Sequence, residues 1–296
     1  MHEVTTEQQR RRQRSDSFRL FLSGGFSGAI ARTLTAPLER IKLLYQVQAI
    51  AQASTTSAPY VYNSILQTAD KIYREEGVRA FWRGNGTNVV RIFPYSAVQF
   101  STNDACKRLL ASPDGHLLVS QRLLAGAVAG MSATLVTHPL DVIRLRMSLP
   151  HSGYTGILNA FLTVTRTEGS KALFKGLGPA LIGIAPFAAI NFASYDLLKR
   201  NLFGADASTT AVHNLGLGAA SGLLASSVCF PLDTVRRQMQ MRACMYRGQA
   251  DAMGCIWRSE GLRGFYRGWA ANALKVIPQN SIRFASYEAL KSLLNV

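Results

Sequence analysis

The chain has 296 residues, of which 48% are hydrophobic, and a formal net charge of +16. Such a basic balance suggests nucleic acid or an anionic surface as a partner, but the sequence contains no zinc-ligand spacing, RNA-binding signature or basic helix. The apolar segments 21–38, 123–140 and 215–232 approach the about 20 residues that cross a bilayer, so the composition argues against a nucleic-acid partner and favours anionic lipid and anionic solutes.

In chain order, the sequence begins with a basic tail at 1–16 that does not resemble a secretory signal. We expect this tail to be disordered, with a weak targeting segment as the alternative. Three repeats follow, at 17–112, 119–204 and 210–296. Each repeat predicts a long helix, a loop, a short amphipathic helix and a second long helix. The first repeat is longer than the other two. Its extra residues fall near 49–59, a polar stretch that is typical of a flexible loop.

Four markers keep a constant period along the chain. PLERIK at 37–42 recurs as PLDVIR at 139–144 and as PLDTVR at 231–236. A Glu-Gly pair, an aromatic-base-Gly triplet and a second proline follow in the same order each time. The triplets end at Gly84, Gly176 and Gly268, and the second prolines are Pro94, Pro186 and Pro278. A fixed period of this kind indicates one structural unit built three times.

The long helices carry the features of packed membrane helices. Two glycines four residues apart precede the first proline of each repeat: Gly24 and Gly28, Gly126 and Gly130, Gly218 and Gly222. Small residues at this spacing let membrane helices approach closely, and a proline inside a helix kinks it. The sequence therefore predicts six kinked, membrane-spanning helices.

The threefold motif, together with its Glu-Gly and aromatic-base-Gly partners, resembles the mitochondrial carrier family over nearly the whole chain. The resemblance implies an all-α membrane protein, with six transmembrane helices in three pseudo-threefold repeats and three short matrix helices. It also implies a multi-pass, monomeric transporter of the mitochondrial inner membrane that works by alternating access. No catalytic dyad, metal site or Rossmann context is present, so we expect no enzyme activity, metal or cofactor.

The acid and the base of the repeated motif form a matrix gate in the family. After the proline kink, the acid and the base three residues later share one helix face, and charges at membrane depth are costly and usually paired. The resemblance implies that three pairs close one end of the cavity: Glu39 with Arg144, Asp141 with Arg236, and Asp233 with Lys42.

The family also places a glutamine brace beneath such a pair. Gln46 and Gln240 match the brace positions in the first and third repeats. Ser148 occupies the position in the second repeat, so we expect no brace there.

A second set of charges, at the ends of the other three long helices, has the family's cytoplasmic-gate spacing. The implied pairs are Asp104 with Lys199, Asp196 with Lys291, and Glu288 with Lys107. Tyr195 and Tyr287 precede two of the acids, as in the family, whereas Asn103 replaces the first tyrosine. Solvated helix ends are the alternative interpretation of these six charges.

Three positions lie three residues before the second prolines and should face one another across the cavity at mid-membrane: Arg91, Gly183 and Lys275. We expect Arg91 and Lys275 to be unpaired cations that bind phosphate. Gly183, with Ile184 beside it, offers a flat base an apolar slot with close backbone approach. Three further residues complete the candidate binding set: Arg32, Asn88 and Phe187.

The Gly-Ile pair at 183–184 resembles carriers of adenine nucleotides and their relatives. Arg236, Arg237 and Met239 resemble the ADP/ATP carriers, but Gln238 and Gln240 interrupt the arginine and methionine run that those carriers require. The segments 84–88 and 274–278 look like the branch that carries ATP-Mg/phosphate, AMP/ADP and coenzyme A. The implied function is antiport of an adenine-nucleotide-type anion, with another phosphorylated or anionic solute as the alternative.

Lipid sites are expected at helix N-termini, where free backbone N–H groups bind phosphate. The resemblance makes the ligand cardiolipin, and ordinary helix capping is the alternative. The candidate positions are Gly84, Gly156, Gly176, Gly248 and Gly268.

Overall fold

The computed structural model describes residues 23–54, 64–111, 118–150, 152–204, 210–241 and 246–293. The described part is helical and contains no strand. The predicted basic tail at 1–16 and residues 55–59 of the predicted loop lie outside the described residues. Residues 49–54 are helical, so the loop prediction was wrong there, because the helix Ala36–Ser54 includes them. Within the described residues, Cys106, Cys229 and Cys255 are free thiols.

Each repeat consists of two long helices with a short helix between them. In the first repeat, helical residues 23–34 lead into α2 (Ala36–Ser54), followed by α3 (Ile65–Glu76), a 3-10 turn η1 (Val78–Trp82) and α4 (Asn85–Leu110). The second repeat has α5 (Val119–Met147), α6 (Ile157–Glu168), η2 (Ser170–Phe174) and α7 (Leu177–Phe203). The third has α8 (Ala211–Met241), α9 (Gln249–Phe265) and α10 (Trp269–Leu293).

The third repeat differs only locally from the other two. Gly261 has φ 60° and ψ −152° inside α9, so the backbone breaks at the point where Gly77 and Gly169 separate the short helix from η1 and η2. All three glycines have positive φ, a conformation that costs glycine little. The Glu-Gly marker is therefore the stop signal of the short helix.

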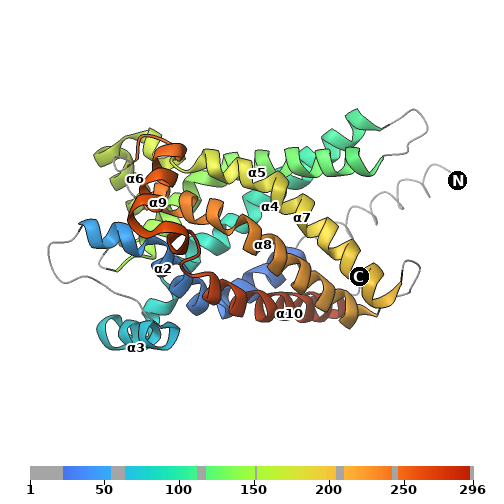
Figure 1. Cartoon of the computed structure of the whole chain (residues 1–296), viewed down its shortest axis with the longest axis horizontal. Coiled ribbons are helices and arrows are strands. Elements are labelled where there is room, and N and C mark those ends of the chain that lie inside the picture. The colour runs from blue at the N-terminus through green and yellow to red at the C-terminus, as the bar shows by residue number, and fades with distance from the viewer. Residues whose placement is uncertain are drawn as a thin grey trace, which may run out of the picture.

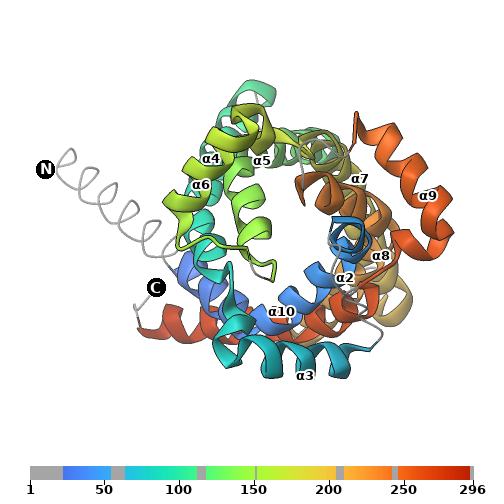
Figure 2. The same ribbon diagram turned by 90° about the vertical axis from the view of Figure 1, so that its left-hand side faces the viewer.

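The long helices stand in a ring, and the short helices α3, α6 and α9 gather outside it at one end (Figures 1 and 2). α4 packs along α5, and α7 packs along α8, so neighbouring repeats join through these pairs. Pro94, Pro139, Pro186, Pro231 and Pro278 all lie inside long helices. Among the described residues, three helical stretches are long and apolar enough to cross a membrane: Ser120–Met147, Ser170–Phe203 and His213–Met241.

The buried core lies at the end that carries the short helices. Leu43, Val47, Leu145 and Met241 form one apolar cluster where α2, α5 and α8 meet. Three further clusters, one in each repeat, seat a short helix against the long helix before it. In the second repeat, Ile143 of α5 packs against Ala160 and Val164 of α6. The helices at this end are therefore closely packed, and this packing positions the charged residues of the repeated motif.

Candidate functional site

The acids and bases of the repeated motif meet between α2, α5 and α8. Lys42 Nζ lies 2.7 Å from Asp233 Oδ2, and Arg144 Nη2 lies 3.0 Å from Glu39 Oε1. Arg236 contacts Asp141 through its Nη2. These are the three pairs that the family pattern implies, and we call them the ion-pair ring. Each pair joins two repeats, so the ring closes the space between all three helices.

Each acid of the ion-pair ring also contacts a second cation. Arg91 Nε lies 2.9 Å from Asp141 Oδ1, and Lys275 Nζ hydrogen-bonds Glu39 Oε2. Arg237 Nε lies 3.6 Å from Asp233 Oδ1, one helical turn away. The expectation that Arg91 and Lys275 are unpaired was therefore wrong. The helices α4 and α10 place Arg91 and Lys275 close enough to the ring to pair with its acids, Asp141 and Glu39.

The charges of this cluster do not balance. Six cations (Lys42, Arg91, Arg144, Arg236, Arg237 and Lys275) contact three carboxylates (Glu39, Asp141 and Asp233), which leaves a formal charge of 6 − 3 = +3. The Asp141 side chain is only 1% exposed. A positive excess in a poorly solvated place favours binding of a polyvalent anion, because opposite charges attract more strongly at low dielectric.

The two predicted brace glutamines have different surroundings. Gln46 Nε2 donates to Asp233 Oδ2 at 3.2 Å, beneath the Lys42–Asp233 pair. The Gln240 side chain instead accepts a hydrogen bond from Arg237 Nη1 at 3.3 Å, so the contact of Gln240 is with Arg237 rather than with the Asp141–Arg236 pair. Ser148 Oγ donates to the carbonyls of Arg144 and Arg83. The third repeat thus departs from the predicted arrangement, because the side-chain oxygen of Gln240 accepts its hydrogen bond from Arg237.

The other candidate contact residues lie on the helical segment 23–34, α4 and α7. Arg32 Nη1 donates to Asn88 Oδ1 at 3.3 Å, which joins the first helix of the repeat to α4. An added Cβ at Gly183 would meet no atom within 4 Å, whereas a Cβ on Gly130 would lie 3.3 Å from the Ile184 side chain. Gly183 therefore faces open space, while Ile184 packs against α5. Phe187 is 40% exposed.

The six residues of the predicted cytoplasmic gate are apart in this structure. Within the described ranges, no ion pair joins any of them, and the three acids Asp104, Asp196 and Glu288 are exposed. Tyr195 donates to Asn214 at 2.9 Å rather than to a gate residue. A cavity of about 640 Å³ lies at this level, lined by residues that include Asn280, Arg283 and Tyr287. The ion-pair ring is thus closed while the opposite end is unpaired.

The candidate lipid glycines fall into two groups. Gly84, Gly176 and Gly268 have φ near +80° and precede or begin α4, α7 and α10; a Cβ there would lie 2.8–2.9 Å from the carbonyl of Arg144, Arg236 or Lys42. Close packing against the next repeat explains these three. Gly156 and Gly248 are the N-caps of α6 and α9, with extended backbone and nothing within 4 Å of an added Cβ. The space at Gly156 and Gly248 is open to a ligand.

Sequence reasoning missed several charged residues of this end. Arg40 is 1% exposed, and its Nη2 contacts both carboxylate oxygens of Glu76, at 2.8 and 2.9 Å. Arg146 contacts Glu168 in the second repeat. The available signal was the glutamate of the Glu-Gly marker, which recurs at a constant period, whereas Arg40 and Arg146 occupy different positions of the repeat.

Comparisons with known proteins agree with this geometry. The family model described as mitochondrial carrier protein matches residues 13–114, 115–206 and 207–296. The chain is 42% identical to the probable envelope ADP,ATP carrier protein, chloroplastic, of Arabidopsis thaliana, over 93% of this chain and 71% of that protein. It is 40% identical to the thylakoid ADP,ATP carrier protein, chloroplastic, of the same plant, over 93% of this chain and 65% of that protein.

A third relative has a different named solute. The chain is 36% identical to the mitochondrial coenzyme A transporter of Xenopus tropicalis, over 92% of this chain and 84% of that protein. The relatives are transporters of nucleotide-type small molecules, and the family consists of multi-pass membrane transporters rather than enzymes. The predicted all-α carrier fold in three repeats is confirmed, and this chain belongs to the mitochondrial carrier protein family.

Proposed function

We propose that this protein is an antiporter of adenine-nucleotide-type anions and works by alternating access. The candidate solutes are ATP, ADP and AMP, with coenzyme A or adenosine 3',5'-diphosphate as further members of the class. The observation that carries the proposal is the sharing of Glu39 and Asp141 between the ion-pair ring and the cations Lys275 and Arg91. The names of the nucleotide and coenzyme A relatives support the same class of solute.

This sharing offers a route from anion binding to opening of the gate. A phosphate group that binds Arg91 and Lys275 competes with the carboxylates that now hold them, and arginine can donate to it in pairs. Asp141 and Glu39 then lose their second cation and stay paired only with Arg236 and Arg144, so fewer contacts hold the ring closed. A ligand opens a gate only to the extent that it binds the open state better, and charge competition at these two cations supplies that difference.

The apolar side of the site is the proposed place for the base. Gly183 faces open space, Ile184 packs beside it, and Phe187 is exposed nearby along α7. Arg32 and Asn88, which are hydrogen-bonded to each other, provide polar contacts on the opposite side. In this arrangement the phosphates lie toward α4 and α10, and the base lies against α7.

The two gates of the proposal are the ion-pair ring, with Gln46 beside it, and the charged residues at the other end. In the present state the ion-pair ring is closed and Asp104, Lys107, Asp196, Lys199, Glu288 and Lys291 are apart, as in a carrier open to the cytoplasmic side. Closure of this second set would pair each acid with the lysine of a neighbouring repeat. Monomeric action follows from a cavity built within one chain.

The proposed location is the mitochondrial inner membrane, with cardiolipin bound at the N-termini of the helices that follow Gly84, Gly156, Gly176, Gly248 and Gly268. Two relatives are named as chloroplast proteins, so a plastid membrane is the competing location. Fractionation of the source cells with tagged protein distinguishes the two. Cardiolipin binding is measured by native mass spectrometry of the purified protein.

The test of the function is uptake by proteoliposomes loaded with one unlabelled solute and supplied with another that is radiolabelled. Nucleotide-type antiport requires fast uptake of labelled ATP, ADP, AMP or coenzyme A only when an adenine compound is inside. Uptake of a different phosphorylated solute, with no competition from any adenine compound, supports the alternative of a carrier for another anion and overturns the nucleotide assignment.

A further inference from the structure

A second set of contacts between the repeats lies beside the ion-pair ring and ends on backbone carbonyls. Arg40 Nε donates to the carbonyl of Ser148, Arg146 Nε to the carbonyl of Gln240, and Gln238 Nε2 to the carbonyl of Gln46, each at 3.2 Å. The three acceptors occupy equivalent places, nine residues after Pro139, Pro231 and Pro37. The three acceptor carbonyls are therefore equivalent positions of the threefold repeat.

The donors do not share one register. Arg146 and Gln238 lie seven residues after their prolines, but Arg40 lies three residues after Pro37. The equivalents of Arg40 in the other repeats are Val142 and Thr234, whose short side chains cannot reach the acceptor carbonyl as the arginine does. The first repeat thus uses a different donor position to reach the same acceptor position. What the three repeats share is a hydrogen bond to a carbonyl of the next repeat.

Each donor is buried and held by the short-helix segment of its own repeat. The exposed fractions of Arg40, Arg146 and Gln238 are 1%, 3% and 1%. Glu76 at the end of α3 binds Arg40, and Glu168 at the end of α6 binds Arg146 with a 2.9 Å contact. The Arg40 and Arg146 bonds therefore each join a short helix, through one side chain, to the end of a long helix in the next repeat.

In the third repeat a tyrosine takes the place of the glutamate. Tyr246 Oη lies 3.0 Å from Gln238 Oε1, before the start of α9. Burial, followed by the nearby acidic groups Cys255, Glu260 and Asp251, raises the pKa of Tyr246 to about 12. The hydroxyl therefore keeps its proton at neutral pH and donates to Gln238, which leaves the Gln238 amide free to donate to Gln46.

We propose that Arg40, Arg146 and Gln238, with the carbonyls of Ser148, Gln240 and Gln46, form a carbonyl ring that holds this end of the carrier closed in addition to the ion-pair ring. The inference rests on the proposed alternating access, because it assigns the ring a role in one of the two states. The three bonds donate from α2 to the end of α5, from α5 to α8 and from α8 to α2. They cross the same three interfaces as the ion pairs, whose cations donate in the opposite direction.

The carbonyl ring differs from the ion-pair ring in its response to substrate. Arg91 and Lys275 contact Asp141 and Glu39, so an anion can compete for the ion pairs. The carbonyl-ring donors bind other partners, and the apolar cluster of Leu43, Val47, Leu145 and Met241 lies among the same helices. An anion in the cavity therefore cannot compete for these bonds directly. They add a fixed barrier that keeps an empty carrier from opening and so favours exchange over leak.

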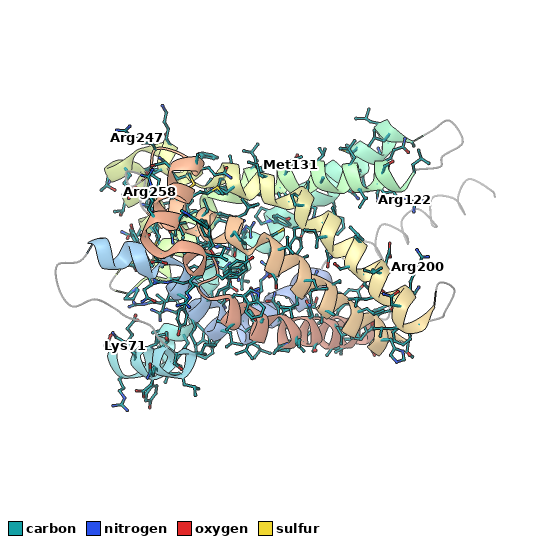
Figure 3. The ribbon with its side chains drawn as sticks, viewed as in Figure 1. Lys71, Arg122, Met131, Arg200, Arg247 and Arg258 are labelled. Carbon is teal, nitrogen blue, oxygen red and sulfur yellow. The ribbon has the colours of Figure 1, made fainter. Side chains whose placement is uncertain are left out.

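The sharpest test is Gln238→Glu, which keeps the shape of the side chain but replaces the amide donor with an acceptor. Spin labels at Lys71→Cys in α3 and Arg258→Cys in α9, in a background without native cysteines, report the separation of the repeats that the Gln238 bond joins. Both positions lie at the short-helix end (Figure 3). Distances are measured in proteoliposomes without substrate, and leak is measured as efflux into buffer that lacks a counter-substrate.

We expect Gln238→Glu and Gln238→Ala to raise the population with the longer label distance by about two- to tenfold, the factor that corresponds to one net hydrogen bond. The ratio of leak to exchange should rise with it. Gln67→Glu and Gln67→Ala are matched controls, because Gln67 is exposed on α3, and both should match the parent. Tyr246→Phe, which removes only the hydroxyl that holds Gln238, should change both readouts in the same direction by a smaller factor.

Unchanged label distances in a folded Gln238→Glu protein would overturn the carbonyl ring, as would a lower melting temperature with an unchanged ratio of leak to exchange. If Gln238→Glu does not fold, the same two readouts on Tyr246→Phe decide the question. A parent protein that exchanges no adenine compound would instead remove the proposed substrate, and the label distances would still test the ring.

Discussion

Arg91 Nε lies 2.9 Å from Oδ1 of Asp141, the same carboxylate whose other oxygen contacts Arg236 of the next repeat. One acid thus connects a cation on α4 with the interface between α5 and α8. Lys275 has the same relation to Glu39, which contacts Arg144. The residues proposed to bind the solute and the residues proposed to close the gate are one connected network, and the predictions below follow from that connection.

Arg91→Ala and Lys275→Ala should each lower nucleotide exchange by at least about tenfold, since a hydrogen bond to a charged group contributes about 1.5–3 kcal/mol. Asp141 and Glu39 each keep one cation, so both variants should still fold and extract in mild detergent. The measurement is exchange in proteoliposomes, with size-exclusion chromatography as the folding check. Arg122→Ala, at an exposed position on α5 toward the opposite end (Figure 3), is the control and should match the parent. Near-normal exchange by either cavity variant would remove the phosphate-contact role.

The pair of Glu39 and Arg144 should show coupling in a double-mutant cycle. Glu39→Arg and Arg144→Glu each place like charges together, and the double variant restores one attractive pair, so it should recover part of the lost transport. Recovery stays partial because the new arginine at 39 faces Lys275, which now binds the Glu39 carboxylate. If the effects of the two single substitutions on transport simply add in the double variant, the interaction energy is zero. That outcome would reject this gate pair.

Gly183→Trp should weaken adenine compounds more than inorganic phosphate. An added Cβ at Gly183 meets no atom within 4 Å, so we expect the fold to accept a side chain there, and the indole would fill the space proposed for the base. Excess ATP, ADP or coenzyme A should raise the melting temperature of the parent, because a ligand that binds only the folded state stabilises it, and should raise that of Gly183→Trp less. Equal shifts in both proteins would place the base elsewhere.

Gly84→Ala and Gly268→Ala should destabilise the protein by about 1–3 kcal/mol, because both residues have positive φ and no room for a Cβ. At Gly84 the new carbon would lie 2.4 Å from Ser148 Oγ and 2.8 Å from the Arg144 carbonyl. Gly156→Ala is the matched comparison, since its backbone is extended and its surroundings are open. Thermal unfolding in one detergent measures all three. A Gly156 variant as unstable as the other two would contradict the packing explanation.

The sequence determined the threefold repeat, and the resemblance to the family implied the partners in the ion-pair ring. Periodicity reveals the repeat because equivalent residues of a threefold structure lie at one height, and an acid and a base three residues apart share a helix face. The same register predicts that Gly183 lies opposite Arg91 and Lys275, and the structure adds that Gly183 faces open space.

Only the tertiary structure decided which further groups these charges reach. The packing of α4 against α5 and of α10 against α2 brings Arg91 and Lys275 onto Asp141 and Glu39, and no spacing within one helix encodes that approach. Arg40 has no counterpart in the other repeats, so its position carries no periodic signal. Its acceptor, the carbonyl of Ser148, is a group that every residue possesses, and a backbone acceptor is therefore identified by packing rather than by residue type.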